Sequence, residues 1–388
     1  MKASTQRLSN WLLLAGAALG FLLATWQGRE ATGYSKPDNF RRFHQRLSPD
    51  TLFYPPYAML ERLALARWQP GKVLVIVGGN SILNGVGQPE DDVWSLRLQY
   101  LLGDSYVVVN LAMRSAAPTQ AGALVAESLQ RRGYPVIYVA NTTPTAGPAL
   151  PVGPPLGYLY WQARAQGALA AYAPRDEAVA RWEANLAPRE RALLAEEKLG
   201  ATLEAWTHHQ SLWHHFGYRH VFTVWNFLLR GDFWRPRRQL ADNEPPAPPV
   251  EQRFQRYFAE EMVLVRGNTE GVAAATTGGH WVLGEYSRPQ MVADINAGFP
   301  PALRPRMLML LDLGAPVYLA ALTPAEQARS RDIYAAAAQL WREQGIACVV
   351  AGEGFIPDDY VDRAHLSRDG GNKLAALVAE KIRQFPPP

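Results

Sequence analysis

The sequence predicts an α/β fold: a doubly wound parallel sheet with a largely helical insertion and an N-terminal membrane anchor. Three observations carry this prediction. Short runs of β-branched and apolar residues alternate with segments of helical spacing in residues 71–150 and again in residues 314–388, which is typical of βαβ units. Residues 151–313 interrupt this alternation with mainly helical patterns. An uncharged apolar run, residues 11–26, precedes all of them.

The composition is that of a folded globular protein. Of 388 residues, 48% are hydrophobic and 19% are charged, enough for one large core and an insertion. The net charge of +4 is spread along the chain outside Arg235–Arg238, so nucleic acid is not an expected partner. The single cysteine, Cys348, lies in an apolar run and is expected to be a small core residue, which excludes a disulfide framework.

Residues 1–30 are expected to be a signal anchor. Lys2 and Arg7 precede the apolar run, which is shorter than the ~20 residues of a comfortable transmembrane helix. Trp26 occupies the place where a cleavage site would need small residues, so an uncleaved anchor is favoured over a cleaved signal peptide. We expect a single-pass cell-membrane protein that is extracytoplasmic after the anchor, and periplasmic in a Gram-negative cell. Residues 31–70 read as a spacer with one short helix.

The first strand leads to a candidate nucleophile. Residues 73–77 form a continuous apolar run, which predicts a strand buried on both faces. Gly78 and Gly79 permit a sharp turn at its end, and Ser81 follows. In open parallel sheets ligands bind beyond the carboxyl ends of the strands. Ser81 is therefore placed where a catalytic serine could act.

Four more elements complete residues 71–150. Helical spacing over residues 93–101 ends at Gly103, a second strand follows from Tyr106, a helix is expected over residues 119–132, and a third strand spans residues 136–141. Residues 314–388 resume the pattern with a strand over 316–321, a helix over 323–343, a strand over 346–350 and a helix over 373–382.

A base and an acid are found near the C-terminus. A serine nucleophile needs a base to take its proton and a group that orients the base. Asp362 and His365 lie in the loop between the last strand and the last helix, again at a strand's carboxyl end. The order Ser81, Asp362, His365 therefore predicts a Ser-His-Asp triad.

Together these segments resemble the SGNH (GDSL-type) hydrolase family. Gly79-Asn80-Ser81-Ile82 is similar to its first block, with Asn80 where Asp is commoner, and Asp362-x-x-His365 is similar to its last block. The strand end at Asn110–Ala116 is similar to the second block, with Ser115 where glycine is usual, and Asn141 matches the third, which has Thr142 in place of Asp. The likeness covers about residues 71–145 and 314–385.

The resemblance implies a flavodoxin-like sheet and acyl transfer without a metal or cofactor. Ser81 would be the nucleophile, His365 the base and Asp362 its orienting acid. The backbone N–H groups of Ser81 and Ser115 and the Asn141 side chain would form the oxyanion hole.

With the anchor, the resemblance implies a serine esterase that acts on a cell-envelope ester or acylated polysaccharide. Two alternatives remain: an O-acetyltransferase of an envelope polysaccharide, served by an integral-membrane acyl donor, and a catalytically degenerate envelope scaffold.

The insertion, residues 151–313, leaves two questions open. Its five clustered histidines lack the i, i+4 spacing of helical metal ligands, so a metal site is not favoured; they are His208, His209, His214, His215 and His220. Residues 218–234 read either as a core helix or, with the arginines that follow, as a membrane-surface helix. His280, between glycines and an aromatic, is a weaker candidate base than His365.

Overall fold

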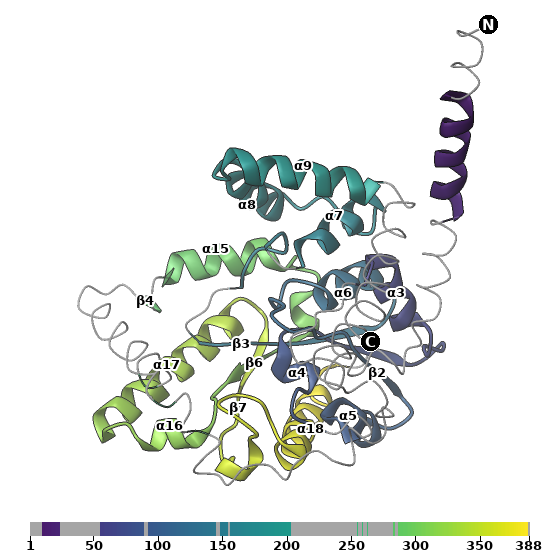
Figure 1. Ribbon diagram of the computed structural model, residues 1–388. Helices are drawn as coiled ribbons and strands as arrows, with labels where there is room; N and C mark the ends of the chain where they lie inside the picture. The colour runs from purple at the N-terminus through teal and green to yellow at the C-terminus, as the bar shows by residue number, and fades with distance from the viewer. Residues whose placement is uncertain are drawn as a thin grey trace, which may run out of the picture.

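The computed structural model has a five-stranded parallel sheet at its centre (Figure 1). It describes residues 10–23, 55–88, 92–144, 148–153, 156–202, 254, 258, 262, 282–283 and 286–386. The strands are β1 (Val73–Val77), β2 (Tyr106–Asn110), β3 (Val136–Thr142), β6 (Met307–Asp312) and β7 (Ala347–Ala351), in the order β2-β1-β3-β6-β7. The α/β prediction with a parallel sheet is confirmed.

Helices cover both faces of this sheet. The side chains of Leu74 and Ile76 point into a core shared with α3 (Tyr57–Leu65), α6 (Gly122–Arg131) and α17 (Pro324–Glu343). Those of Val73, Val75 and Val77 point into a second core with α5 (Trp94–Leu102) and α18 (Arg368–Ile382). Burial on both faces explains why the central strands lack polar alternation: every residue of β1 and β3 is buried.

The chain reverses its direction of winding between β1 and β3. Val77 pairs with Asn110 of β2 on one side and with Val139 of β3 on the other. A crevice opens at such a switch point because the connections leave in opposite directions. Gly122 of α6 lies so close to the turn that a Cβ there would be 2.8 Å from the Gly78 Cα. The close contact between α6 and Gly78 fixes the end of β1, and Ser81 follows three residues after Gly78.

One strand prediction is wrong. Residues 316–321 do not form a strand; Pro316–Ala320 is a helix, α16, which has proline in its first turn. The fourth strand of the sheet is β6, within the range 151–313 assigned to the insertion. Proline suits a helix start because its φ is preset and its missing N–H has no partner there. The run Met307–Leu311 has no β-branched residue, so its strand character depends on burial between β3 and β7.

The other elements predicted within residues 71–150 and 314–388 are present, with shifted ends. α6 begins at Gly122 rather than residue 119, and α18 begins at Arg368 rather than 373, capped by the Ser367 side chain. Thr323 caps α17 and forms a capping box with Glu326.

The described part of the insertion is mainly helical. It contains α7 (Gly157–Ala165), α8 (Ala173–Ala184), α9 (Pro188–Thr202) and α15 (Arg288–Gly298), together with a short antiparallel pair, β4 (Val282–Leu283) and β5 (Tyr286–Ser287). Figure 1 shows α7, α8 and α9 grouped beyond α6. Residues 203–253, with the histidine cluster and the predicted aromatic helix, lie outside the described residues, as does His280.

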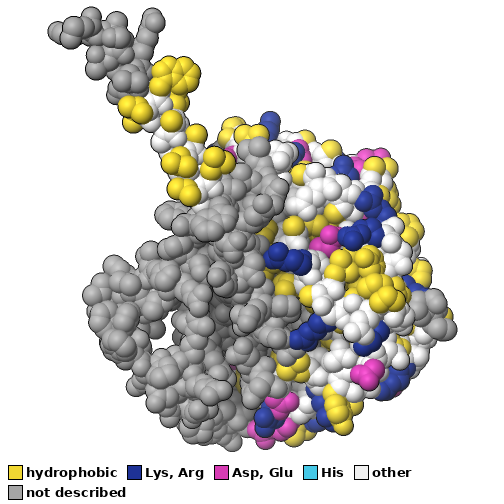
Figure 2. Space-filling view, turned by 90° about the vertical axis from the view of Figure 1, so that its right-hand side faces the viewer, with side chains coloured by type: hydrophobic (Ala, Val, Ile, Leu, Met, Phe, Trp, Pro, Cys, Tyr) yellow, Lys and Arg dark blue, Asp and Glu magenta, His cyan; other side chains and the backbone are white. Residues whose placement is uncertain are grey.

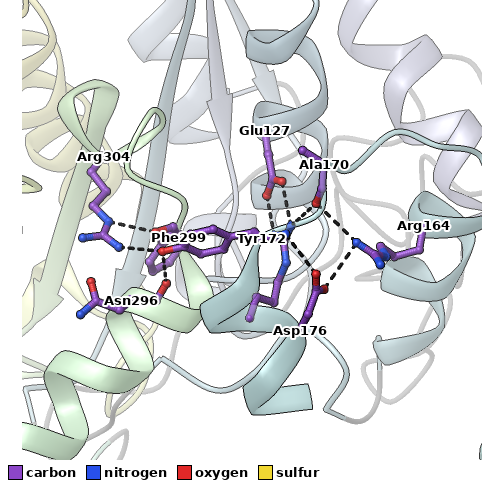
Figure 3. A network of polar contacts seen from close by, with 9 residues as sticks. Glu127, Arg164, Ala170, Tyr172, Asp176, Asn296, Phe299 and Arg304 are labelled. Atoms are coloured by element: carbon purple, nitrogen blue, oxygen red, sulfur yellow. Dashed lines mark hydrogen bonds and ion pairs between the residues drawn. The ribbon is translucent and has the colours of Figure 1, made fainter. Parts of the chain in front are cut away.

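A buried ion pair joins the insertion to α6 (Figure 3). The two terminal guanidinium nitrogens of Arg175, on α8, donate to the two carboxylate oxygens of Glu127, at 2.6 and 2.9 Å. The Arg175 side chain is 1% exposed and the Glu127 side chain 9%. On the α15 side of the network the Tyr172 hydroxyl donates to the Asn296 carbonyl at 2.7 Å. The network therefore connects three elements that are distant in the sequence.

Residues 10–23 form a helix whose side chains are exposed on every side. Figure 2 shows its apolar side chains as a projecting yellow arm. Trp11 is 70% exposed and Leu22 64%. Within the described residues, no helix combines the length and the apolar character that a membrane crossing requires.

Candidate active site

The turn after β1 is built so that Ser81 opens a helical turn. Asn80 adopts an extended backbone and caps α4 (Ser81–Asn84), because its side-chain oxygen accepts the Ile82 N–H at 2.9 Å. Gly79 has a φ of +89°, and a Cβ there would lie 2.1 Å from the Asn141 side-chain oxygen. Only glycine meets both conditions. The local backbone of the turn therefore explains why glycine and asparagine precede Ser81.

The last loop brings the acid and the base to this serine. Nε2 of His365 lies 2.8 Å from the Ser81 hydroxyl oxygen, and Nδ1 lies 2.7 Å from Oδ2 of Asp362. Because a carboxylate can only accept, Nδ1 carries the ring proton and Nε2 is left to accept from the serine. The Ser81 hydroxyl, the His365 ring and the Asp362 carboxylate therefore form one continuous chain of hydrogen bonds.

The Asp362 carboxylate is held in place by the loop itself. Its Oδ1 accepts the backbone N–H groups of Ala364 at 3.0 Å and His365 at 2.8 Å. Burial alone would raise the pKa of Asp362, but the hydrogen bond from His365, the charge of that ring and the two N–H groups outweigh it and lower the pKa below its usual value. The carboxylate is therefore ionised throughout the neutral range.

The loop is anchored to the last helix. Asp359 is 2% exposed, and its Oδ2 accepts the Lys373 ammonium at 2.6 Å and the Ile356 N–H at 2.7 Å. The Asp359 carbonyl accepts the Ser367 N–H at 2.8 Å, and a Cβ at Gly370 would lie 2.1 Å from the same carbonyl oxygen. The backbone on both sides of the Asp362–His365 pair is thus fixed to α18.

The backbone N–H groups of Ser81 and Ser115 are the donors that the sequence analysis expects in an oxyanion hole. Neither the Ser81 nor the Ser115 N–H donates a hydrogen bond to another residue of the described ranges. Ser115 has a φ of +60°, in the left-handed region. Glycine adopts this conformation at no steric cost. Ser115 has the same backbone need without that freedom.

The Asn141 side chain reaches the site but is not a free donor. Its Nδ2 donates to the Asn80 side-chain oxygen at 2.8 Å and to the Asp312 carboxylate at 2.5 Å. An amide nitrogen has two hydrogens, so both are engaged. The expectation that this amide points at an oxyanion does not fit the hydrogen bonds of this conformation.

Sequence reasoning missed Asp312, which ends β6 beside Asn141. The signal was present, since a carboxylate directly follows an apolar run, but that run was assigned to the insertion. Burial raises the pKa of Asp312 to about 7, although the Asn141 hydrogen bond lowers it. Among the described residues no group of His, Cys, Asp and Glu could hold a metal ion.

Comparisons with known proteins add little to this geometry. No protein-family model and no curated protein matches the chain. Among solved structures, the chain is similar to the native aryl esterase of M. smegmatis, with 13% identity and a TM-score of 0.30. The match covers 81% of this chain and 100% of the esterase. A likeness of this size carries no argument about activity.

Proposed function

We propose that this protein is a serine ester hydrolase of the SGNH type. The single observation that carries the proposal is the chain of hydrogen bonds from the Ser81 hydroxyl through His365 to Asp362. Support comes also from the position of Ser81 at the switch point of the sheet, where ligands of open α/β folds bind.

In the proposed reaction the Ser81 oxygen attacks an ester carbonyl while His365 Nε2 takes the serine proton. Asp362 remains ionised and stabilises the imidazolium that forms. The N–H groups of Ser81 and Ser115 stabilise the oxyanion; loss of one such donor typically costs ~100–1000-fold in rate. The imidazolium then protonates the departing alkoxide, which leaves Ser81 acylated. Water then attacks the acyl carbonyl while His365 takes its proton. The acid is released, and His365 returns the proton to the Ser81 oxygen.

The substrate and location form a further part of the proposal. The exposed apolar helix over residues 10–23 supports attachment to the cell membrane, because apolar side chains gain free energy in lipid. The substrate would then be an envelope ester or an acylated polysaccharide. An O-acetyltransferase would use the same three residues, with a sugar hydroxyl in place of water and an integral-membrane partner as acyl donor.

The test is turnover of p-nitrophenyl acetate by the full chain. Ser81→Ala should lose at least ~1000-fold in kcat/KM, since removal of a triad nucleophile leaves only the residual catalysis of the site. Ser105→Ala, at an exposed serine before β2, is the matched control and should keep full activity. No turnover by the wild type, or equal activity of the Ser81→Ala variant, would overturn the proposal. Transfer of acetyl to an added sugar would favour the transferase.

A further inference from the structure

Asp312 lies outside the proposed triad. Its carboxylate is the last member of a chain of hydrogen bonds that begins at the nucleophile turn, the turn that carries Ser81. It is the last residue of β6, next to the end of β3, where Leu311 pairs with Thr142. Its Oδ2 accepts a hydrogen from Asn141 Nδ2 at 2.5 Å. No lysine or arginine of the described residues forms an ion pair with this carboxylate, so the amide is its main polar partner.

The Asn141 amide in turn holds the residue before the nucleophile. Its Oδ1 accepts the Asn80 backbone N–H at 3.1 Å, and its Nδ2 donates to the Asn80 side-chain oxygen at 2.8 Å. That same Asn80 oxygen caps α4 by accepting the Ile82 N–H. Asn141 therefore binds both the backbone and the side chain of Asn80, the residue before Ser81.

The ionised Asp312 carboxylate fixes the orientation of the Asn141 side-chain amide. The two ends of an amide have nearly the same shape, and rotation by 180° exchanges a donor for an acceptor. An ionised Asp312 only accepts, so the amide nitrogen must face it. The Asn141 oxygen must then face the Asn80 N–H. The reversed amide would place a donor against that N–H and an acceptor against Asp312, so both contacts would be lost.

Two tyrosines of the described residues also lie near Asp312. The Tyr334 hydroxyl, from α17, donates to the Asp312 backbone carbonyl at 2.8 Å. Tyr360 is buried in the loop that carries Asp362 and His365; burial, with the nearby Asp312 and Asp359 charges, raises its pKa. Asp312 is thus located between the nucleophile turn and the acid–base loop.

We propose that Asp312 is a positioning residue for Ser81: it orients the Asn141 amide, which holds Asn80 and so fixes the backbone of the nucleophile turn. This role rests on the proposed esterase function, but Asp312 itself does not touch the reacting atoms. Its loss should therefore act on turnover more than on substrate binding, and only while Asn141 is present.

The test is a double-mutant cycle with p-nitrophenyl acetate at pH 8. Asp312→Ala should lower kcat about 10-fold and change KM by less than about 3-fold, whereas in the Asn141→Ala background it should lower kcat by less than about 2-fold. Asp312→Asn, whose oxygen can still accept from Asn141, should retain kcat within about 3-fold of the wild type. Asp332→Ala, at an exposed aspartate on α17, is the matched control.

Equal losses in both backgrounds, or full kcat in Asp312→Ala, would overturn the proposal. If Asp312→Ala does not fold, the cycle is run with Asp312→Leu, which fills the site without an acceptor. The thermal midpoints of the same four proteins give a readout that needs no turnover. Asp312 and Asn141 could be coupled in stability while the wild type neither hydrolyses the ester nor reacts with a fluorophosphonate. That result would contradict the esterase function but retain the contact. No coupling in midpoint or in kcat would contradict the positioning role.

Discussion

The Ser81 hydroxyl lies 2.8 Å from Nε2 of His365, although 284 positions separate the two residues in the sequence. The parallel sheet brings them together, because the carboxyl ends of β1 and β7 open at the same edge. Local contacts then fix each partner: Asn80 caps the turn that carries Ser81, and Asp362 binds the backbone of the loop that carries His365.

The first prediction concerns the pH dependence of ester hydrolysis. Asp362 stays ionised because its pKa is lowered, so it should contribute no limb to kcat/KM near neutral pH. A histidine base must be neutral to take the serine proton, so kcat/KM should show an acidic limb that depends on His365. His365→Ala should lose at least ~1000-fold and with it this limb. The measurement is kcat/KM for p-nitrophenyl acetate from pH 5 to 9. A flat wild-type profile would contradict a histidine base.

The second prediction concerns Asp312 and stability. The unfolded carboxyl has a pKa of ~3.9, and burial raises it to about 7 in the folded chain. Between these values the folded state binds the extra proton, so the free energy of unfolding should fall as pH rises from about 4 to about 7. Asp312→Asn should remove this slope. Its thermal midpoint should exceed that of the wild type at pH 8 and match it at pH 4.

The same Asp312→Asn comparison can fail in a clear way. An equal difference between the two midpoints at both pH values would mean that the carboxyl does not change its protonation between them. Asp332→Asn, at a solvent-exposed position of α17, should follow the wild type at each pH.

The third prediction concerns the ion pair that joins α8 to α6. Glu127→Ala should destabilise the protein by about 3–5 kcal/mol, because the buried Arg175 charge loses its partner. Replacing both residues, Glu127→Leu with Arg175→Met, should cost much less, since no charge is then left buried. Denaturant unfolding of the wild type and these two variants measures the difference. A double variant less stable than Glu127→Ala would refute the argument.

The fourth prediction concerns the exposed helix over residues 10–23. Replacing Leu13 and Leu22 by Gln should reduce sedimentation of the full chain with phosphatidylcholine vesicles, about 10-fold or more, because two apolar side chains are lost from the lipid contact. Leu193→Gln with Leu199→Gln is the matched control, since these exposed leucines lie on α9. Equal binding of both double variants would contradict a membrane role for this helix. Turnover of a soluble ester should be unchanged in each.

The sequence was most informative where burial or a local motif decided the structure. β1 and β3 are buried on both faces, so their apolar runs were sufficient to locate them. The Asp362–His365 pair forms its hydrogen bonds within one loop, and its spacing was recognised through the resemblance to the last block of the SGNH family together with Ser81. Both are local properties of the chain.

What could not be predicted depends on contacts between distant segments. The strand character of Met307–Leu311 comes from its neighbours β3 and β7, while the more β-like run after it is a helix that starts at Pro316. Because the residues of β6 were assigned to the insertion, Asp312 was not recognised as a residue at a strand end near Ser81. The orientation of the Asn141 amide depends on that same carboxylate, and no spacing in the sequence indicates it.

The anchoring of the acid–base loop to α18 has a consequence for biosynthesis. Ser81 is translated 284 positions before His365, and the helix that supports the loop of His365 is translated after both. A nascent or prematurely terminated chain that stops before α18 would carry the serine without a correctly held base. The chain of hydrogen bonds from Ser81 through His365 to Asp362 can therefore be held in place only after α18 has been made.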